Sequence, residues 1–271
     1  MTATSLSREP AAGPAVAAAA EPACAPVPGQ AVSVAMATHN GARFVTIQLE
    51  SILSQLSAGD ELVVVDDASV DGTAALIARA GDPRVRLLCN PRNLGVRASF
   101  ERALRATRHP LVFLSDQDDV WLPGKRSILA DALAHGALLA LSDASVIDGA
   151  GDVVASSFMA RRGGFRGSVF ATVVKNRYLG CTMAFRRELL ELALPIPAEV
   201  PMHDMWLGAL AAQRGRVSYV GRPLIQYRRH HGNLSPGRRA GLAQMLRWRW
   251  RLVRLLIERR VRGPMPVPVA E

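Results

Sequence analysis

The stretch Leu111-Val-Phe-Leu-Ser-Asp-Gln-Asp-Asp-Val-Trp-Leu-Pro123 decides the fold of this chain. Its first residues, Leu111 to Leu114, are a continuous apolar run, which is typical of a strand covered on both faces of a sheet. The acidic run Asp116 to Asp119 follows, and Pro123 then opens a helix expected to reach about His135. A buried strand that ends in acidic residues and leads into a helix is typical of parallel α/β sheets, in which ligands bind outside the carboxyl ends of the strands.

Upstream of this stretch the same alternation repeats. Short apolar strands are followed by helices whose apolar residues recur at three- and four-residue spacing. The strands are predicted at 32–36, 62–65 and 85–89, and the helices at 45–56, from Thr73 onward, and at 96–106. This alternation predicts an α/β fold with a mostly parallel, doubly wound sheet that has helices on both faces.

The second half of the chain has a weaker pattern. Strands are predicted at 138–146, 179–185, 217–220 and 224–227, a helix at 205–213, and a surface loop over the Gly-, Ser- and Arg-rich residues 148–167. From these patterns we expect an Ala- and Pro-rich disordered leader over residues 1–30, one α/β domain over 31–235 and a basic amphipathic tail over 236–271.

The composition limits the class of protein. The 271 residues are 49% hydrophobic and 21% charged, which suits a packed domain and excludes wholesale disorder. The net charge of +10 suggests a nucleic-acid partner, but nine arginines and one glutamate lie between Arg238 and Arg262, so one segment carries most of it. Because only 5% of residues are aromatic and no stacking platform is visible, we expect no nucleic-acid partner.

The cysteines and the hydropathy indicate a compartment. Cys24, Cys89 and Cys181 are far apart and form no C-x-x-C pair, so neither a disulfide framework nor a cysteine-based zinc site is expected. A reducing cytosol is the expected location. No uninterrupted run of about 18 apolar residues occurs, which argues against a transmembrane helix.

Two acidic groups at predicted strand ends are candidates for ligand binding. Asp116 to Asp119 suits a divalent cation such as Mg²⁺ or Mn²⁺, and the alternative is an acidic loop that caps the next helix. Asp66 and Asp67 can accept hydrogen bonds from a base or a ribose, while Asp71 suits a helix cap. The chain lacks G-x-G-x-x-G and G-x-x-x-x-G-K-[ST], which argues against dinucleotide oxidoreductases and P-loop NTPases. It also lacks a Gly-rich phosphate loop after the first predicted strand, which argues against a nucleotidyltransferase.

Two further candidates come from the second half. Asp204, after His203, is either the N-cap of a helix or a general base partly buried against Trp206. In the segment from Tyr227 to Asn233, a histidine can bind a metal and the arginines a phosphate. The alternative for this segment is a basic strand end at the surface.

Together and in this order, these groups resemble the motifs of inverting family 2 glycosyltransferases with the GT-A fold, and more narrowly those of bacterial rhamnosyltransferase-like members. The matching stretches span about 32–235 and are Met36–Gly41, Gln48–Leu53, Val64–Ser69, Asp71–Thr73, Asn93–Val96, Phe113–Pro123, Leu179–Met183, His203–Trp206 and Leu224–His230. The resemblance implies a Rossmann-like central sheet and a hexosyl-transferring enzyme.

The resemblance also implies roles for individual residues. Asp204 matches the catalytic base, while Asp118 and His230 match groups that hold a divalent cation. Two departures stand out, because His231 competes with His230 for its role and His39 stands where relatives usually have tyrosine. The residues expected to bind the nucleotide sugar are Thr38, Asn40, Asp66, Asp67, Asn93, Asp116 and Arg229.

The substrates are also implied by the resemblance. It favours L-rhamnose from dTDP-rhamnose as the donor, with a UDP-sugar as the alternative. The acceptor is expected to be a hydroxyl of a saccharide or a lipid-linked molecule, in the synthesis of a bacterial cell-surface polysaccharide.

The segment Leu242 to Glu258 is predicted to be an amphipathic helix. Its apolar face, its arginine-rich face and the border residues Trp248 and Trp250 are typical of a helix that lies in a membrane interface. The alternative is a helix that packs its apolar face on the domain. The membrane interpretation predicts a cytoplasmic protein held peripherally on the anionic inner face of the plasma membrane.

Overall fold

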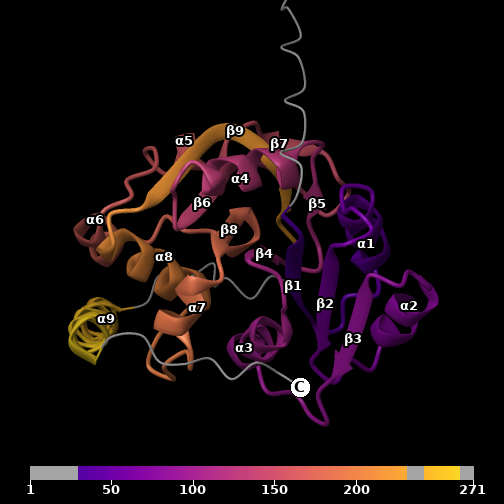
Figure 1. Cartoon of the computed structure of the whole chain (residues 1–271), viewed down its shortest axis with the longest axis horizontal. Coiled ribbons are helices and arrows are strands. Elements are labelled where there is room, and N and C mark those ends of the chain that lie inside the picture. The colour runs from indigo at the N-terminus through magenta and orange to yellow at the C-terminus, as the bar shows by residue number, and fades with distance from the viewer. Residues whose placement is uncertain (1–29, 231–240, 263–271) are drawn as a thin grey trace, which may run out of the picture.

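The computed structural model describes residues 30–230 and 241–262 (Figure 1). The predicted leader lies almost entirely outside the described residues, and so does His231. The C-terminal tail is described from 241 to 262.

The first half of the chain folds as the sequence predicts. In chain order it forms β1 (Val32–Thr38), α1 (Val45–Leu53), β2 (Glu61–Asp66), α2 (Thr73–Arg79), β3 (Val85–Cys89), α3 (Val96–Ala106) and β4 (Leu111–Ser115). The four strands pair in parallel in the order β3-β2-β1-β4. Their carboxyl ends therefore open on one edge of the sheet.

The second half extends the sheet with mixed pairing. Its elements are β5 (Val120–Trp121), α4 (Lys125–Ala134), β6 (Leu139–Ile147), β7 (Val153–Ala155), α5 (Phe158–Arg161), α6 (Val169–Val174), β8 (Met183–Arg186), α7 (Glu188–Ala193), α8 (His203–Gln213) and β9 (Val217–Arg228). β8 is antiparallel to β4 and β6, whereas β9 is parallel to β6 and antiparallel to β5. The sheet order is β3-β2-β1-β4-β8-β6-β9-β5, with β7 paired to β6.

Several predictions for the second half are wrong in detail. The predicted loop 148–167 contains β7 and α5, and the predicted strand 179–185 begins as a 3-10 turn, Gly180–Thr182, before β8 starts. The predicted strands 217–220 and 224–227 are one strand, β9, which is irregular near Pro223. Proline removes one ladder donor and interrupts the pattern without ending the strand. β5, α6 and α7 were not predicted, because such short elements hold too few residues to show a period.

Two apolar clusters cover the two faces of the sheet. Successive residues of a strand point to opposite faces, so Val63 lies in the cluster that includes residues of α3, α7 and α8, while Val64 lies in the cluster that includes residues of α1 and α4. Figure 1 shows these helices on both sides of the strands. Burial on both faces explains the continuous apolar run of β2.

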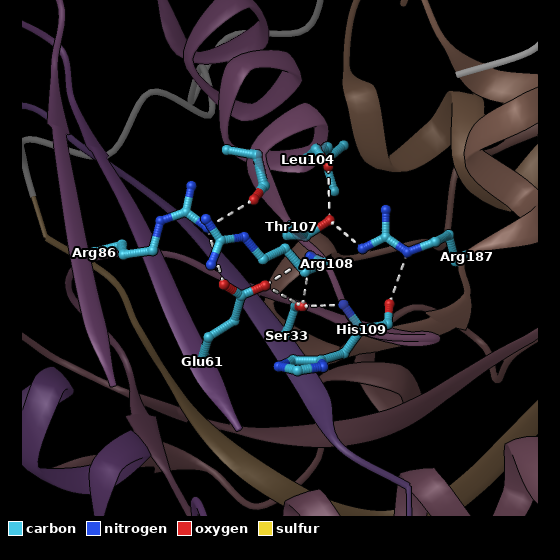
Figure 2. A network of polar contacts seen from close by, with 9 residues as sticks. Ser33, Glu61, Arg86, Leu104, Thr107, Arg108, His109 and Arg187 are labelled. Atoms are coloured by element: carbon cyan, nitrogen blue, oxygen red, sulfur yellow. Dashed lines mark hydrogen bonds and ion pairs between the residues drawn. The ribbon is translucent and has the colours of Figure 1, made fainter. Parts of the chain in front are cut away.

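A polar network joins the start of β2 to the end of α3 (Figure 2). The buried Glu61 carboxylate accepts hydrogen bonds from the Ser33 hydroxyl (2.7 Å), the Arg108 amide (2.6 Å) and the Arg86 guanidinium (3.1 Å). Arg86 also donates to the carbonyl of Ala106 at the end of α3 (3.1 Å). The network fixes β1, β2 and the α3–β4 connection at the end of the sheet opposite the carboxyl ends, and it also includes Leu104, Thr107, His109 and Arg187.

The predicted C-terminal helix is present as α9 (Leu242–Arg262) and contacts α6 and α8. One side of it is buried in the core through Leu252, Leu255 and Leu256. Arg249 donates to the carbonyl of Val174 at the end of α6 (2.6 Å). Among the helices of the described ranges, α9 included, none is both long and apolar enough to cross a membrane.

Candidate functional site

Three parallel strands bring the candidate residues to one edge of the sheet. Thr38 ends β1 opposite Asp66, which ends β2, and Ser115 ends β4 opposite Met36 of β1. The loops that follow these strands therefore start side by side. Asp71, predicted as a cap, binds the amides of Thr73 (3.0 Å) and Ala42 (2.9 Å), although Gly72 occupies the N-cap position of α2.

The Asp66 carboxylate is buried and supports the edge. It accepts hydrogen bonds from the Thr38 hydroxyl (2.9 Å) and from the amide (2.9 Å) and hydroxyl (2.6 Å) of Ser69. These bonds hold the end of β1 and the loop after β2 together. Asp66 and Thr38, both predicted to bind the nucleotide, thus lie in direct contact.

The neighbouring Asp67 carboxylate holds a different loop. It accepts hydrogen bonds from the Asn90 side chain (2.6 Å) and from the amides of Leu94 (2.8 Å) and Gly95 (2.8 Å). Burial opposes ionisation of Asp67, but these hydrogen bonds outweigh it and lower the pKa of the carboxyl below its ordinary value. The carboxylate stays ionised and fixes the start of α3.

His39 connects three of the predicted nucleotide-binding loops. Its Nδ1 lies 2.8 Å from the Asp67 carbonyl oxygen, and its Nε2 lies 3.2 Å from the side-chain Nδ2 of Asn40 and 3.1 Å from the side-chain Nδ2 of Asn93. The Gln117 side chain accepts from the His39 amide (2.8 Å) and donates to its carbonyl (3.0 Å). His39, which stands where relatives usually have tyrosine, therefore contacts Asn40, Asn93 and Gln117 of the acidic run.

The structure brings Asp118 and His230 together, although 112 positions separate them. β5, which starts directly after Asp119, pairs with the last part of β9, so the acidic run lies next to the end of β9. His230 Nε2 lies 2.8 Å from Asp118 Oδ2, and the two side chains are 20% and 12% exposed. The Arg228 amide donates to the Asp119 carboxylate (2.9 Å) and its Nε to the Asp118 carbonyl (2.8 Å). The structure therefore brings the two predicted metal ligands into contact, and both side chains are mostly buried.

A second acidic group lies deeper. Ligand atoms of Asp116, Asp119 and Cys181 lie within 4.8 Å of one another. Burial and neighbouring carboxylates raise the pKa of Asp116 well above its ordinary value, and burial with the charge of Asp118 raises that of Asp119 to about 7. Burial likewise raises the pKa of the Cys181 thiol.

Lys125 lies beneath this deeper group. Its ammonium is fully buried, donates to the Cys181 carbonyl and lies 4.0 Å from the centroid of the Trp121 ring. Burial lowers the pKa of Lys125 to about 8. An ammonium beside these carboxylates supplies positive charge in the deeper group.

The donor sets of the two groups differ in how well they suit a cation. Mg²⁺ and Mn²⁺ prefer carboxylate and water ligands, neutral imidazole is a common metal ligand in proteins, and a protonated thiol is a poor one. Asp118 and His230 meet that preference, whereas the deeper group adds a buried thiol and an ammonium. The predicted divalent cation therefore fits best at Asp118 and His230.

Asp204 lies in the first turn of α8, because the helix begins at His203 and Met202 occupies the N-cap position. The N-cap alternative for Asp204 is thereby excluded. Its buried carboxylate accepts a hydrogen bond from the Gly180 amide (3.2 Å). Burial raises the pKa of Asp204 to about 6, and the charge of Asp204 contributes to the raised pKa of Asp116. Asp204, the predicted base, is therefore close enough to the acidic run for its charge to affect ionisation of Asp116.

Arg229 directly precedes His230, and His203 directly precedes Asp204. Arg229 is exposed at the end of β9, where its amide donates to the Ile147 carbonyl (2.8 Å). His203 stacks on Phe100 with a centroid distance of 4.0 Å, and burial lowers its pKa to about 4. The sequence does not predict a role for Lys125 or Cys181. Cys181 lies within the matched stretch Leu179–Met183, and Lys125 lies two residues after the stretch Phe113–Pro123.

The model of glycosyl transferase family 2 matches residues 33–192, which is more than half of the chain. This protein belongs to that family.

Curated relatives match over parts of their length. The succinoglycan biosynthesis protein ExoO of Rhizobium meliloti is 36% identical over 117 residues, 43% of this chain and 34% of that protein. The UDP-Glc:alpha-D-GlcNAc-diphosphoundecaprenol beta-1,3-glucosyltransferase WfgD of Escherichia coli is 31% identical over 94 residues, 35% of this chain and 37% of that protein. The matched segments therefore span about a third of these two relatives.

The fold is shared with a solved structure. Residues 1–349 of S. aureus TarS, in complex with UDP-GlcNAc, superpose with a TM-score of 0.65 at 17% identity, over 88% of this chain and 68% of that one. This likeness confirms the predicted fold class.

Proposed function

We propose that this protein transfers a sugar from a nucleotide-sugar donor to a hydroxyl of a saccharide or lipid-linked acceptor, with inversion, in bacterial cell-surface polysaccharide synthesis. The observation that carries the proposal is the buried Asp204 carboxyl, with a pKa of about 6, whose charge acts on Asp116 in the same acidic run as Asp118. A base that ionises near neutral pH beside groups that can hold a diphosphate suits a single displacement.

Each residue has one task in the proposed reaction. Asp204 accepts the proton of the attacking hydroxyl, so no covalent nucleophile is needed. Asp118 and His230 would hold a divalent cation, which would supply positive charge near the diphosphate of the donor. Asp66 or Asp67 binds the base and Asp116 the ribose, while the remaining predicted contacts to the nucleotide sugar come from Thr38, Asn40, Asn93 and Arg229.

The experiment that tests the base is Asp204→Asn. The variant removes the proton acceptor but keeps the shape of the side chain, so transfer should be lost while binding of a nucleoside diphosphate persists. Release of nucleoside diphosphate measures the first, and calorimetric titration with UDP and with dTDP, with and without Mn²⁺, measures the second. Asp152→Asn, at an exposed position, is the matched control. Normal turnover by Asp204→Asn would remove the assignment.

The donor we propose is dTDP-L-rhamnose, because the motifs resemble those of rhamnosyltransferase-like enzymes. A UDP-sugar is the competing donor, and the name of WfgD and the TarS complex both concern UDP-sugars. A panel of nucleotide sugars, scored by release of nucleoside diphosphate, separates the two. Release from a UDP-sugar without release from dTDP-rhamnose would overturn the rhamnose assignment and leave the transferase proposal standing.

We further propose that α9 binds an anionic membrane surface, which would hold the protein peripherally on the cytoplasmic face of the plasma membrane. The observation behind this is a stripe of exposed apolar side chains along α9: Leu246, Trp250, Val253, Ile257 and Val261. Their spacing of three and four residues puts them on one side of the helix. Arginines flank the stripe, as a helix on anionic lipid requires.

A further inference from the structure

Phe44 lies between the nucleotide loop and the metal pair. It is buried and occupies the N-cap position of α1, shortly after the loop at His39 and Asn40. The centroid of its ring lies 5.1 Å from that of the His230 ring, at an interplanar angle of 41°. The Arg228 guanidinium lies 4.7 Å from the centroid of the Phe44 ring.

The same Arg228 guanidinium fixes the backbone beside the metal pair. Its Nε donates to the carbonyl of Asp118 (2.8 Å) and its Nη1 to that of Asp148 (3.1 Å). Arg228 is buried, and a flat guanidinium stacked on an aromatic face keeps its donors in a fixed direction. One ring therefore contacts both the histidine of the pair and the arginine that holds the backbone of its carboxylate.

A further contact secures the ring. The Arg43 guanidinium lies 4.8 Å from the Phe44 ring centroid and donates from Nη2 to the Gly149 carbonyl (3.2 Å). A Cβ atom at Gly149 would lie 3.7 Å from the Cβ of His230. The loop after β1, the β6–β7 turn and the end of β9 thus meet around Phe44.

We propose that Phe44 is a positioning residue that holds the His230 imidazole against the Asp118 carboxylate. This inference rests on the proposed role of Asp118 and His230 in holding the cation. His230 lies two residues beyond the end of β9, and the Phe44 ring packs beside its imidazole. Groups that orient metal ligands typically change metal affinity by roughly tenfold or more when they are removed.

The test is a titration of the purified full chain with Mn²⁺ alone, with free Mn²⁺ followed by electron paramagnetic resonance. Phe44→Leu removes the ring and should weaken Mn²⁺ binding by roughly tenfold. Phe44→Met, which has a longer unbranched side chain without a ring, should weaken it similarly, and Phe44→Tyr, which keeps the ring, should retain most of the affinity. Thermal melting of each variant establishes that it is folded.

Phe158→Leu is the matched control. Phe158 packs edge-on against Tyr227 at 5.7 Å and lies under the Arg162 guanidinium at 5.2 Å, so it is also an aromatic residue between β9 and an arginine. Its partners are Tyr227 and Arg162 rather than the metal pair, so its variant should keep the Mn²⁺ affinity within about twofold of the unaltered chain, well short of the loss expected at Phe44. Equal weakening by Phe44→Leu and Phe158→Leu would overturn the positioning role.

His230→Ala and Asp118→Asn separate this inference from the proposed function. If both weaken Mn²⁺ binding and the two non-aromatic Phe44 variants bind as the unaltered chain does, the positioning role is wrong and the cation site stands. If neither His230→Ala nor Asp118→Asn changes Mn²⁺ binding, the cation site is wrong and the role of Phe44 falls with it.

Discussion

Asp67 and Asp204 are both buried carboxyls, yet their surroundings move their pKa values in opposite directions. Asp67 accepts hydrogen bonds from Asn90, Leu94 and Gly95, which lower its pKa despite burial. For Asp204, burial outweighs the hydrogen bonds from the amides of Met205 and Gly180. Asp67 is therefore suited to a fixed charge, and Asp204 to exchange of a proton near neutral pH.

The pKa of Asp204 predicts the acidic limb of the pH–rate profile. Burial disfavours the charged form, so the carboxylate that accepts a proton predominates only above about pH 6. We expect kcat/KM to fall roughly tenfold per pH unit below that value. Measurement of kcat/KM across about pH 5 to 8 checks this, with nucleotide binding followed in parallel as the control. A profile that is flat through pH 6 would contradict the assigned base.

The site was predictable from the sequence where a motif carries the chemistry in consecutive residues. The acidic run after β4 and the His203–Asp204 pair are visible in this way. Phe44 was not, because a phenylalanine ahead of an apolar helix is typical of a core residue, and its partner His230 is far away in the chain. Cys181 was not predicted either, since spacing along the chain does not show that it lies near two carboxylates.

At the scale of elements, the network around Glu61 joins β1, β2 and the end of α3 (Figure 2). Glu61→Ala leaves the Ser33 hydroxyl, the Arg108 amide and the Arg86 guanidinium without this acceptor. We expect the free energy of unfolding to fall by roughly 2–4 kcal/mol, because a buried charged acceptor of three hydrogen bonds is lost. Denaturant titration measures the change.

Glu188→Ala is the control for this loss. Glu188 pairs with Arg216 at 3.4 Å, and the two side chains are 52% and 45% exposed. Such an exposed ion pair contributes at most about 1 kcal/mol. Equal losses in the free energy of unfolding for Glu61→Ala and Glu188→Ala would contradict the stabilising role of the network.

α9 presents different surfaces to the domain and to its surroundings. Trp250 and Ile257, at 65% and 58% exposure, lie on the outer stripe. The double variant Trp250→Ser, Ile257→Ser should bind vesicles of phosphatidylglycerol at least roughly tenfold more weakly, since each large side chain contributes about 1.5–3 kcal/mol on burial. Co-sedimentation with the vesicles measures this.

The matched control for the vesicle experiment is Val153→Ser, Val154→Ser, which alters two exposed apolar residues of β7. Its binding should equal that of the unaltered chain, and equal binding by the α9 variant would contradict the membrane proposal. Removal of α9 altogether is a poorer test. It would expose the apolar core residues that Leu252, Leu255 and Leu256 cover. The shortened chain could then sediment by aggregation, which co-sedimentation does not distinguish from vesicle binding.

At the scale of the whole molecule, the parallel half of the sheet was predictable and the remainder was only partly so. β1 to β4 are joined by helices, and each strand and helix is long enough to show its period. The continuation depends on antiparallel pairing of β8 with β4 and β6 and on parallel pairing of β6 with β9, all between segments distant in the chain. Local pattern does not specify such pairs, and the irregular β9 resembled two strands.

α8 connects the region of Asp204, the proposed base, with α9, the proposed membrane-binding helix. It begins beside Asp204 and ends at Gln213, whose side chain donates to the Leu256 carbonyl of α9 (3.2 Å). At 1.5 Å per residue, the helix spans about 14 Å between these two positions. When α9 lies on a bilayer, α8 limits how high above the lipid the base can sit. Lipid-linked acceptors with short saccharides should therefore react faster than long ones, and rates that are independent of saccharide length would contradict such a molecular ruler.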